Sequence, residues 1–253
     1  MLHGGLGLDH TYLVDAFVGG LGDRAHLVFI DHVGNGASSM PPGGPSAVTF
    51  ESMADAIDDV RVRLGVTRWH VVGHSYGGCI ALHLALRHPD TLASLAVIGA
   101  AMSFAHSAAI VVNAQSRATP ELAVAFLSAL GAPASDDTTF GVVWREVLPL
   151  HYHRWDPAYL EAFAASRYSA AAYNRGNELL PSYDLTARVG GIRAATLVIS
   201  GDDDFIMPAA LAGAPLAAAI PGAAHVVVPG SGHMPFHENA PAMFAALNRH
   251  VDR

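Results

Sequence analysis

Short apolar runs alternate with amphipathic stretches near both ends of the chain. The apolar runs lack an internal polar repeat, which is typical of strands buried on both faces of a sheet. Residues 50–64 instead carry apolar side chains at helical spacing. Strands and helices that alternate in this way predict an α/β fold with a mostly parallel sheet and helices on both faces. The predicted strands are residues 26–30, 69–72, 92–99, 196–200 and 225–228.

The alternation stops in the middle of the chain. Between residues 102 and 188 the apolar positions recur at helical spacing, and no good strand pattern is present. We therefore predict an α/β core formed by residues 1–101 and 189–253, with a helical cap inserted at residues 102–188. The helices expected in this cap are residues 104–116, 120–130, 140–148, 157–169 and 170–179.

Composition narrows the classes of function. The 253 residues are 51% hydrophobic and 14% charged, which is enough apolar material for a large folded core. Lys+Arg 14 against Asp+Glu 22 gives a net charge of −8 without a basic run, which argues against nucleic acid or a membrane surface as a partner. No signal peptide or membrane-spanning stretch is recognisable, so we expect a cytoplasmic protein.

Residue types that are missing or rare exclude further kinds of chemistry. The chain has no lysine, which excludes a P-loop lysine, a Schiff-base lysine and a Ser–Lys dyad. Cys79 is the single cysteine, so an internal disulfide and a multi-cysteine metal site are excluded. His83 and His88 would point about 140° away from each other on a helix, unlike two ligands of one metal. We expect no metal and no cofactor.

The sequence Gly73-His74-Ser75-Tyr76-Gly77 lies between an apolar strand and an apolar helix. In that context Gly-x-Ser-x-Gly is typical of a nucleophile elbow, a tight turn that presents its serine at the carboxyl end of a sheet. The two glycines leave room for neighbouring backbone to approach closely. The helix that follows directs N–H groups toward the place where negative charge develops on a substrate. The alternative interpretation is a Gly-Ser turn without chemistry.

A second glycine-rich loop, His3-Gly4-Gly5-Leu6-Gly7, stands at the start of the chain. Its form is that of the second half of an oxyanion hole. In such a site a loop N–H joins the N–H of the residue after the nucleophile, here Tyr76. The alternative interpretation is a flexible N-terminal tail.

Two further loops follow predicted strands near the end of the chain. Gly201-Asp202-Asp203-Asp204 comes after residues 196–200, and Gly232-His233 comes after residues 225–228. Because the carboxyl ends of parallel strands share one edge of a sheet, an aspartate and His233 can meet Ser75 there. The chain order serine, aspartate, histidine is the one expected for an α/β-hydrolase triad. The combination indicates nucleophilic catalysis, although each residue alone fits a solvated turn or a surface histidine.

On these residues the chain resembles the α/β-hydrolase-fold serine hydrolases with a helical cap. Its His-Gly-Gly start is similar to the proline iminopeptidase branch, from which the chain departs at Leu6, Val33, Ala37 and Tyr76. The family normally has further strands ahead of this loop, so we expect either a native start upstream or a sheet that has lost an edge. The motifs that carry the resemblance are His3-Gly4-Gly5, Asp31-x-x-Gly34-x-Gly36-x-Ser38, Gly73-His74-Ser75-Tyr76-Gly77-Gly78, Gly201-x-x-Asp204 and Gly232-His233.

The resemblance implies acyl transfer by a triad of Ser75, Asp204 and His233. Asp204 is preferred over its two neighbours because the family places its acid at the fourth position of Gly-x-x-Asp. The oxyanion hole would combine the N–H of Tyr76 with that of Gly5, for which Leu6 is the other candidate. The expected function is hydrolysis of an ester or amide bond in a small, partly apolar molecule or a short peptide.

Two other functions stay open, and a metal-dependent hydrolase is a weaker third. A proline iminopeptidase-like aminopeptidase needs a cap carboxylate that faces the pocket. A non-catalytic ligand receptor of this fold would have a damaged triad or retain its product. The candidate carboxylates are Glu121, Glu146, Glu161 and Glu178, and the candidate pocket side chains are Met102, Phe104, Phe126, Trp144, Trp155, Tyr168 and Tyr173, with His151, Tyr152, His153 and Asp156 expected on the cap surface or the pocket rim.

Overall fold

A computed structural model describes residues 1–252 of the chain, with the backbone alone at residues 130 and 131. Arg253, the last residue of the core segment predicted at residues 189–253, lies outside the described residues. Within that range, neighbouring strands pair in parallel in the order β1-β2-β3-β4. The strands are β1 (Trp69–His74), β2 (Leu92–Ile98), β3 (Ala195–Gly201) and β4 (Ala224–Val228).

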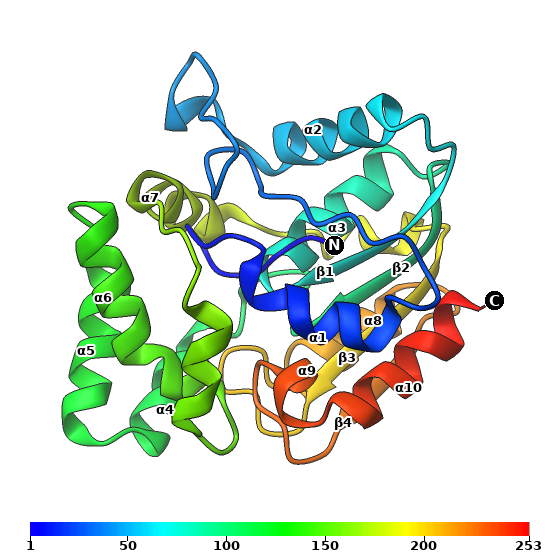
Figure 1. Cartoon of the computed structure of the whole chain (residues 1–253). Coiled ribbons are helices and arrows are strands. Elements are labelled where there is room, and N and C mark those ends of the chain that lie inside the picture. Colours follow the sequence, from blue (N-terminus) through cyan, green and yellow to red (C-terminus); the bar gives the residue numbers. More distant parts are fainter. Residues whose placement is uncertain (253) are drawn as a thin grey trace.

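Alternate side chains of the strands pack on opposite faces of the sheet. Val71, Val97 and Val198 belong to one buried cluster, and Ile98 and Ile199 belong to the other. Figure 1 shows α1 and α10 lying together on one side of the sheet and α2 and α3 on the other. The predicted parallel sheet with helices on both faces is therefore confirmed. The covering helices are α2 (Phe50–Arg63), α3 (Tyr76–Arg87) and α8 (Gly213–Ala219) on the first face, and α1 (Thr11–Leu21), α9 (Pro235–Glu238) and α10 (Ala240–Val251) on the second.

The strand predicted at residues 26–30 is wrong as a regular element. Ile30 forms a single parallel bridge with Leu2, and Leu2 forms another with Gly73 of β1. The N–H of Ile30 donates to the Met1 carbonyl, and the N–H of Leu2 donates to the Val72 carbonyl. Met1 and Leu2 therefore lie between this segment and β1, and these isolated bridges do not continue into a regular strand at residues 26–29.

Between β2 and β3 the chain leaves the sheet and forms a group of helices, which lies to one side of it in Figure 1. Several of these helices begin at a residue that caps the first turn. The side chains of Thr119, Asp136 and Ser169 accept hydrogen bonds from the N–H groups three residues later. The elements are α4 (Ser107–Arg117), α5 (Pro120–Gly131), α6 (Asp137–Val147) and α7 (Ala170–Leu179), with the 3₁₀ turns η2 (Leu148–His151), η3 (Pro157–Phe163), η4 (Leu180–Ser182) and η5 (Val189–Gly191).

The α-helix predicted at residues 157–169 is wrong. Only η3 forms there, and the chain after it runs without helix to Ser169. The N–H of Arg167 donates to the Asp9 carboxylate, and the N–H of Ser169 donates to the Gly7 carbonyl. These bonds to the loop at residues 7–9 occupy amides that a helix would use, so the tertiary contact overrides the local pattern.

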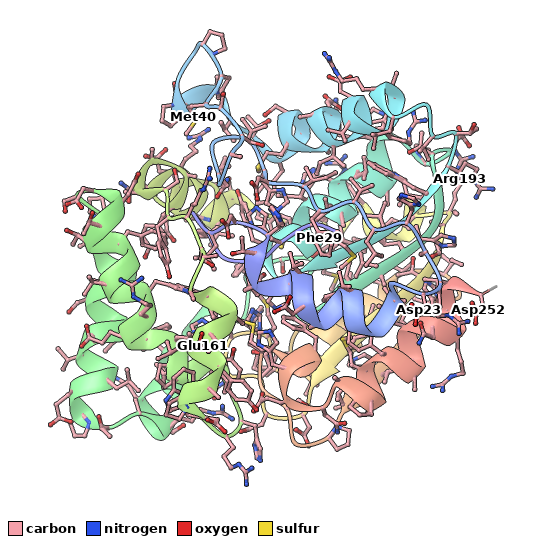
Figure 2. The ribbon with its side chains drawn as sticks, in the orientation of Figure 1. Asp23, Phe29, Met40, Glu161, Arg193 and Asp252 are labelled. Carbon is pink, nitrogen blue, oxygen red and sulfur yellow. The ribbon has the colours of Figure 1, made fainter. Side chains whose placement is uncertain are left out.

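Two surface features are an ion pair that joins the segment after α1 to the end of α10 and the long loop after Asp31. Arg24, just after α1, pairs with Asp252, which lies at the end of α10 and is labelled in Figure 2. Met40 marks the loop after Asp31, which contains the 3₁₀ turn η1 (Pro45–Ala47). None of the helices in the described part of the chain is long and apolar enough to cross a membrane.

Candidate active site

Ser75 occupies a strained turn between β1 and α3. Its φ of 53° and ψ of −120° make it the one non-glycine residue with a positive φ among residues 1–252. A Cβ on Gly73 would lie 2.4 Å from the Gly77 carbonyl oxygen, and a Cβ on Gly77 would lie 2.3 Å from the His3 carbonyl oxygen. The close approach expected at both glycines is confirmed. Strain of this kind persists where surrounding contacts hold it, and it clusters at functional sites.

Asp204 and His233 form a buried pair at the same edge of the sheet. Asp204 follows β3 and His233 follows β4, and His233 Nδ1 donates a hydrogen bond to Asp204 Oδ2 at 2.6 Å. Asp204 Oδ1 accepts from the N–H groups of Ile206 and Met207, both at 2.9 Å. Burial alone would raise the pKa of the Asp204 carboxyl, but the His233 charge and these hydrogen bonds outweigh burial and lower the pKa below its usual value.

Gly99 makes room for this pair, and the sequence analysis did not identify it. Its φ is +56°, and a Cβ there would lie 3.0 Å from the His233 ring and 3.3 Å from Asp204 Oδ2. The sequence feature that could have identified Gly99 is its position directly after β2, at the sheet edge that carries the other loops of the site. A larger residue would push the imidazole away from the carboxylate.

The three consecutive aspartates have three different environments. Asp202 accepts hydrogen bonds from the N–H groups of Gly230 and Ser231, both at 3.0 Å, and holds the β4 loop. Asp203 is partly exposed and pairs with Arg117 and His153. Asp204 is 4% exposed and is the one whose carboxylate contacts His233. The structure thus brings together the aspartate and histidine that the sequence analysis selected.

Three residues of the cavity wall near Ser75 have backbone amides that are unpaired among the described residues. Gly5, Leu6 and Tyr76 all belong to this wall, and their N–H groups have no hydrogen-bond partner in the described part of the chain. Gly4 lies directly against the turn at Ser75, because a Cβ on it would be 2.8 Å from the Ser75 Cβ. The predicted loop at the start of the chain therefore lies beside Ser75.

Tyr12 links the parts of this site through a buried hydrogen-bond chain. The N–H of Gly4 donates to the Tyr12 hydroxyl at 2.6 Å, and that hydroxyl donates to His74 Nδ1 at 2.7 Å. His74 Nε2 then donates to the His233 carbonyl oxygen at 2.9 Å. Burial lowers the pKa of His74 well below its usual value, so its ring is neutral and this donor order is fixed. The sequence analysis missed the role of both residues.

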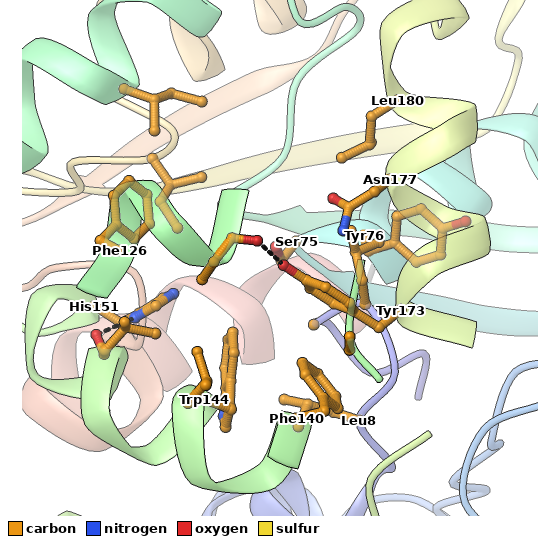
Figure 3. A pocket seen from close by; sticks show the side chains of 18 of the residues that line it. Leu8, Ser75, Tyr76, Phe126, Phe140, Trp144, His151, Tyr173, Asn177 and Leu180 are labelled. Atoms are coloured by element: carbon orange, nitrogen blue, oxygen red, sulfur yellow. Dashed lines mark hydrogen bonds between the residues drawn. The ribbon is translucent and has the colours of Figure 1, made fainter. Parts of the chain in front are cut away.

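A cavity of about 1240 Å³ opens over Ser75. Its floor is formed by the loops at the strand ends, and its walls come from α4, α5, α6 and α7. Figure 3 shows Phe126, Phe140, Trp144 and Tyr173 around the space in front of Ser75. The wall is mainly apolar, which suits a ligand with a sizeable hydrocarbon part.

Some of the side chains proposed for the pocket line it, and others do not. Of the carboxylates, Glu121 and Glu146 belong to the wall, and both are exposed, whereas Glu161 and Glu178 do not contribute. His151, expected on the cap surface or rim, is buried and lines the cavity. The proposed aromatic and apolar lining residues divide into Phe104, Phe126, Trp144 and Tyr173, which line the cavity, and Met102, Trp155 and Tyr168, which do not.

The histidines near α3 have other partners. His88 contacts Asp55 and Asp58, and the His83 ring stacks on Phe50 with ring centroids 5.0 Å apart. Burial lowers the pKa of His83 to about 4, so the ring is neutral. Among the described residues there is no group of three or more metal-ligating side chains with the geometry to hold a metal ion.

Comparisons with known proteins bear on the family and the fold of the chain. A family model described as alpha/beta hydrolase fold matches residues 1–137 and 144–240. The putative carbamate hydrolase RutD of Klebsiella pneumoniae is 30% identical over 222 residues, which are 84% of this chain and 76% of that protein. The proline iminopeptidase PfmaB of Pestalotiopsis fici is 30% identical over 215 residues, which are 82% of this chain and 75% of that protein. A solved esterase structure from Exiguobacterium antarcticum has a similar fold, with a TM-score of 0.77 at 19% identity, covering 100% of this chain and 91% of that one.

Proposed function

This chain belongs to the α/β-hydrolase family and is a hydrolase, and on that premise we propose that it cleaves carboxylic esters of apolar acids through an acyl-enzyme on Ser75. The observations that carry the proposal are the 2.6 Å contact of Asp204 with His233 and the position of His233 and the strained Ser75 in the wall of one mainly apolar cavity. A buried carboxylate of lowered pKa holds the imidazole in one orientation and stabilises its charged form.

The proposed reaction proceeds in two halves. His233 takes the Ser75 proton while the serine oxygen attacks the ester carbonyl, and the N–H groups of Tyr76 and of Gly5 or Leu6 stabilise the negative oxygen that forms. The intermediate expels the alcohol, which receives the proton from His233. A water molecule, deprotonated by His233, then attacks the acyl-enzyme and releases the carboxylic acid.

We assign the segment at residues 102–188 the role of a cap over a core formed by residues 1–101 and 189–253. Its helices supply most of the apolar wall. An ester with a hydrocarbon acyl chain gains from burial against such a wall, whereas a charged group there would lose solvation. This difference favours a neutral substrate.

The first test is intact-mass analysis after treatment with a fluorophosphonate, which needs an activated serine and no particular substrate. We expect one adduct on the wild type and none on Ser75→Ala, with both proteins folded by circular dichroism. p-Nitrophenyl acetate, butanoate and octanoate, with an aryl carbamate included because of the relative's name, then measure turnover. An unlabelled but folded wild type would contradict the proposal, and labelling without turnover of any ester would support the receptor alternative.

A proline iminopeptidase-like activity is the second candidate. It is favoured by the relatives of that name and by Glu121 and Glu146 in the cavity wall, because a carboxylate can bind a substrate ammonium. Both side chains are exposed, so water screens that attraction. Prolyl p-nitroanilide compared with its N-acetyl analogue decides the matter, since an aminopeptidase requires the free amine and an esterase-type site does not.

A further inference from the structure

His151 lies against the catalytic candidates although it comes from the helical segment. Its carbonyl oxygen accepts a hydrogen bond from the N–H of His233 at 2.7 Å, and the centroids of the two rings are 5.9 Å apart. The ring is held between Trp144, at 4.9 Å, and Phe205, at 5.4 Å between centroids. Its position in the cavity wall is therefore fixed by the backbone and by packing on both sides.

The hydrogen bonds of the His151 ring determine what it offers to the cavity. Nδ1 lies 3.3 Å from the Val147 carbonyl oxygen, which can only accept, so Nδ1 carries the proton. Burial lowers the pKa of His151 to about 3, and the ring is neutral at pH 7. Nε2 is therefore an acceptor. Among the described residues it has no hydrogen-bond partner, and Figure 3 shows it on the side of the ring that faces the cavity.

An unpaired acceptor in an apolar wall discriminates between ligands. Of the other buried polar groups of the wall, Tyr12 bonds to His74 and Tyr183 bonds to the Ala101 carbonyl, whereas Trp144 Nε1 can only donate and has no partner among the described residues. A site that holds a free acceptor in this way favours a ligand with a matching donor over one that leaves the acceptor unpaired.

The half of the substrate that meets His151 follows from the proposed reaction, on which this inference rests. His233 has to deliver its proton to the oxygen of the leaving alcohol, so the leaving group lies on the His233 side of the ester carbonyl. His151 borders that side. We propose that His151 is a specificity residue whose Nε2 accepts a hydrogen bond from a hydroxyl or N–H group on the leaving half of the substrate. The substrate class is then an ester of an apolar acid with an alcohol that carries a second hydroxyl or an amide N–H.

Two isosteric esters test the assignment, 2-hydroxyethyl hexanoate and propyl hexanoate. Their alcohols differ by a hydroxyl in place of a methyl group. Each kcat/KM is divided by the ester's rate of alkaline hydrolysis, because the glycol is the slightly better leaving group. We expect the wild type to prefer the hydroxyethyl ester about tenfold, the factor that one neutral hydrogen bond supplies. In His151→Phe the preference should disappear, and in His151→Gln the amide oxygen should restore part of it.

The matched control is His83→Gln, which replaces another buried neutral histidine that does not line the cavity. It should keep the wild-type preference. A wild-type ratio of one or less, or a preference that survives in His151→Phe, would overturn the assignment. Fluorophosphonate labelling of the same samples separates the two levels of the proposal: intact labelling with no preference removes the role of His151 alone, whereas absent labelling of the wild type removes the proposed function and this inference with it.

Discussion

The two sides of the cavity over Ser75 are built in different ways. On the floor, Ser75, Asp204 and His233 each follow a strand closely. Asp204 accepts hydrogen bonds from N–H groups of its own turn, and His233 is held by bonds to Asp204, His151 and His74. The opposite wall consists of side chains on α4 to α7, which meet the floor through a few long-range bonds. In the proposed function, the floor therefore holds the reacting groups in a fixed geometry, and the wall determines the shape of the cavity. Changes on the floor should alter the rate for every substrate, and changes on the wall should alter the choice among substrates.

The largest expected effect comes from the floor. Asp204→Asn should lower kcat by about 10³–10⁴-fold, because the amide cannot stabilise a charged imidazole and favours the wrong tautomer of His233. Asp202→Asn and Asp203→Asn are matched controls in the same loop, and we expect both to stay within a few-fold of the wild type. Steady-state kinetics on p-nitrophenyl butanoate provides the measurement. Loss of turnover in Asp203→Asn with Asp204→Asn unaffected would show that the acid is misassigned.

A smaller effect is expected at Tyr12, which acts through other groups and is a positioning residue. Tyr12→Phe leaves the N–H of Gly4 and His74 Nδ1 without their shared partner. The loop amides and the His233 backbone should then hold their positions less well. We expect kcat to fall about 10–100-fold with KM within about twofold, because binding to the apolar wall is unchanged. The melting temperature should also fall, since buried polar groups lose partners.

Tyr152→Phe is the control for Tyr12→Phe. Tyr152 is also buried and its hydroxyl bonds to a histidine ring, that of His237, at 2.9 Å, but it does not line the cavity. Both variants should lose a similar amount of stability, and kcat should fall in Tyr12→Phe alone. Equal kinetic effects in the two variants would mean that Tyr12 contributes stability and no positioning.

More of the residues that form the floor than of those that form the wall could be identified from the sequence. The Gly73 and Gly77 spacing around Ser75 is a local signal, and so are the strands before each loop. The choice of Asp204 needed the family resemblance, because three neighbouring aspartates look alike until burial and the His233 contact separate them. The catalytic roles of these residues and of the amides at Gly5 and Tyr76 stay predictions.

What the sequence did not reveal depends on contacts between distant residues. Tyr12 and His74 are 62 positions apart, and neither lies in a motif that names the other. His151 belongs to a His-Tyr-His run in which Tyr152 packs elsewhere and His153 pairs with Asp203 on the surface. The wrong helix at residues 157–169 has the same origin, because the Gly7 and Asp9 loop takes its amides. Periodicity describes one element at a time and cannot show which face another element will cover.

The smallest of these effects is expected on the wall, where it should appear as a change of preference. Val142 and Val143 are neighbours on α6: Val143 lines the cavity, and Val142 is 54% exposed and does not. Val143→Trp fills part of the space that a long acyl chain would use, so the ratio of kcat/KM for p-nitrophenyl octanoate to that for the acetate should fall about fivefold to tenfold. Val142→Trp adds the same bulk toward solvent and should keep the wild-type ratio. If kcat/KM falls equally for both esters in Val143→Trp, the substitution disturbs the residues of the floor. The claim that wall residues set substrate preference and floor residues set the rate would then be wrong.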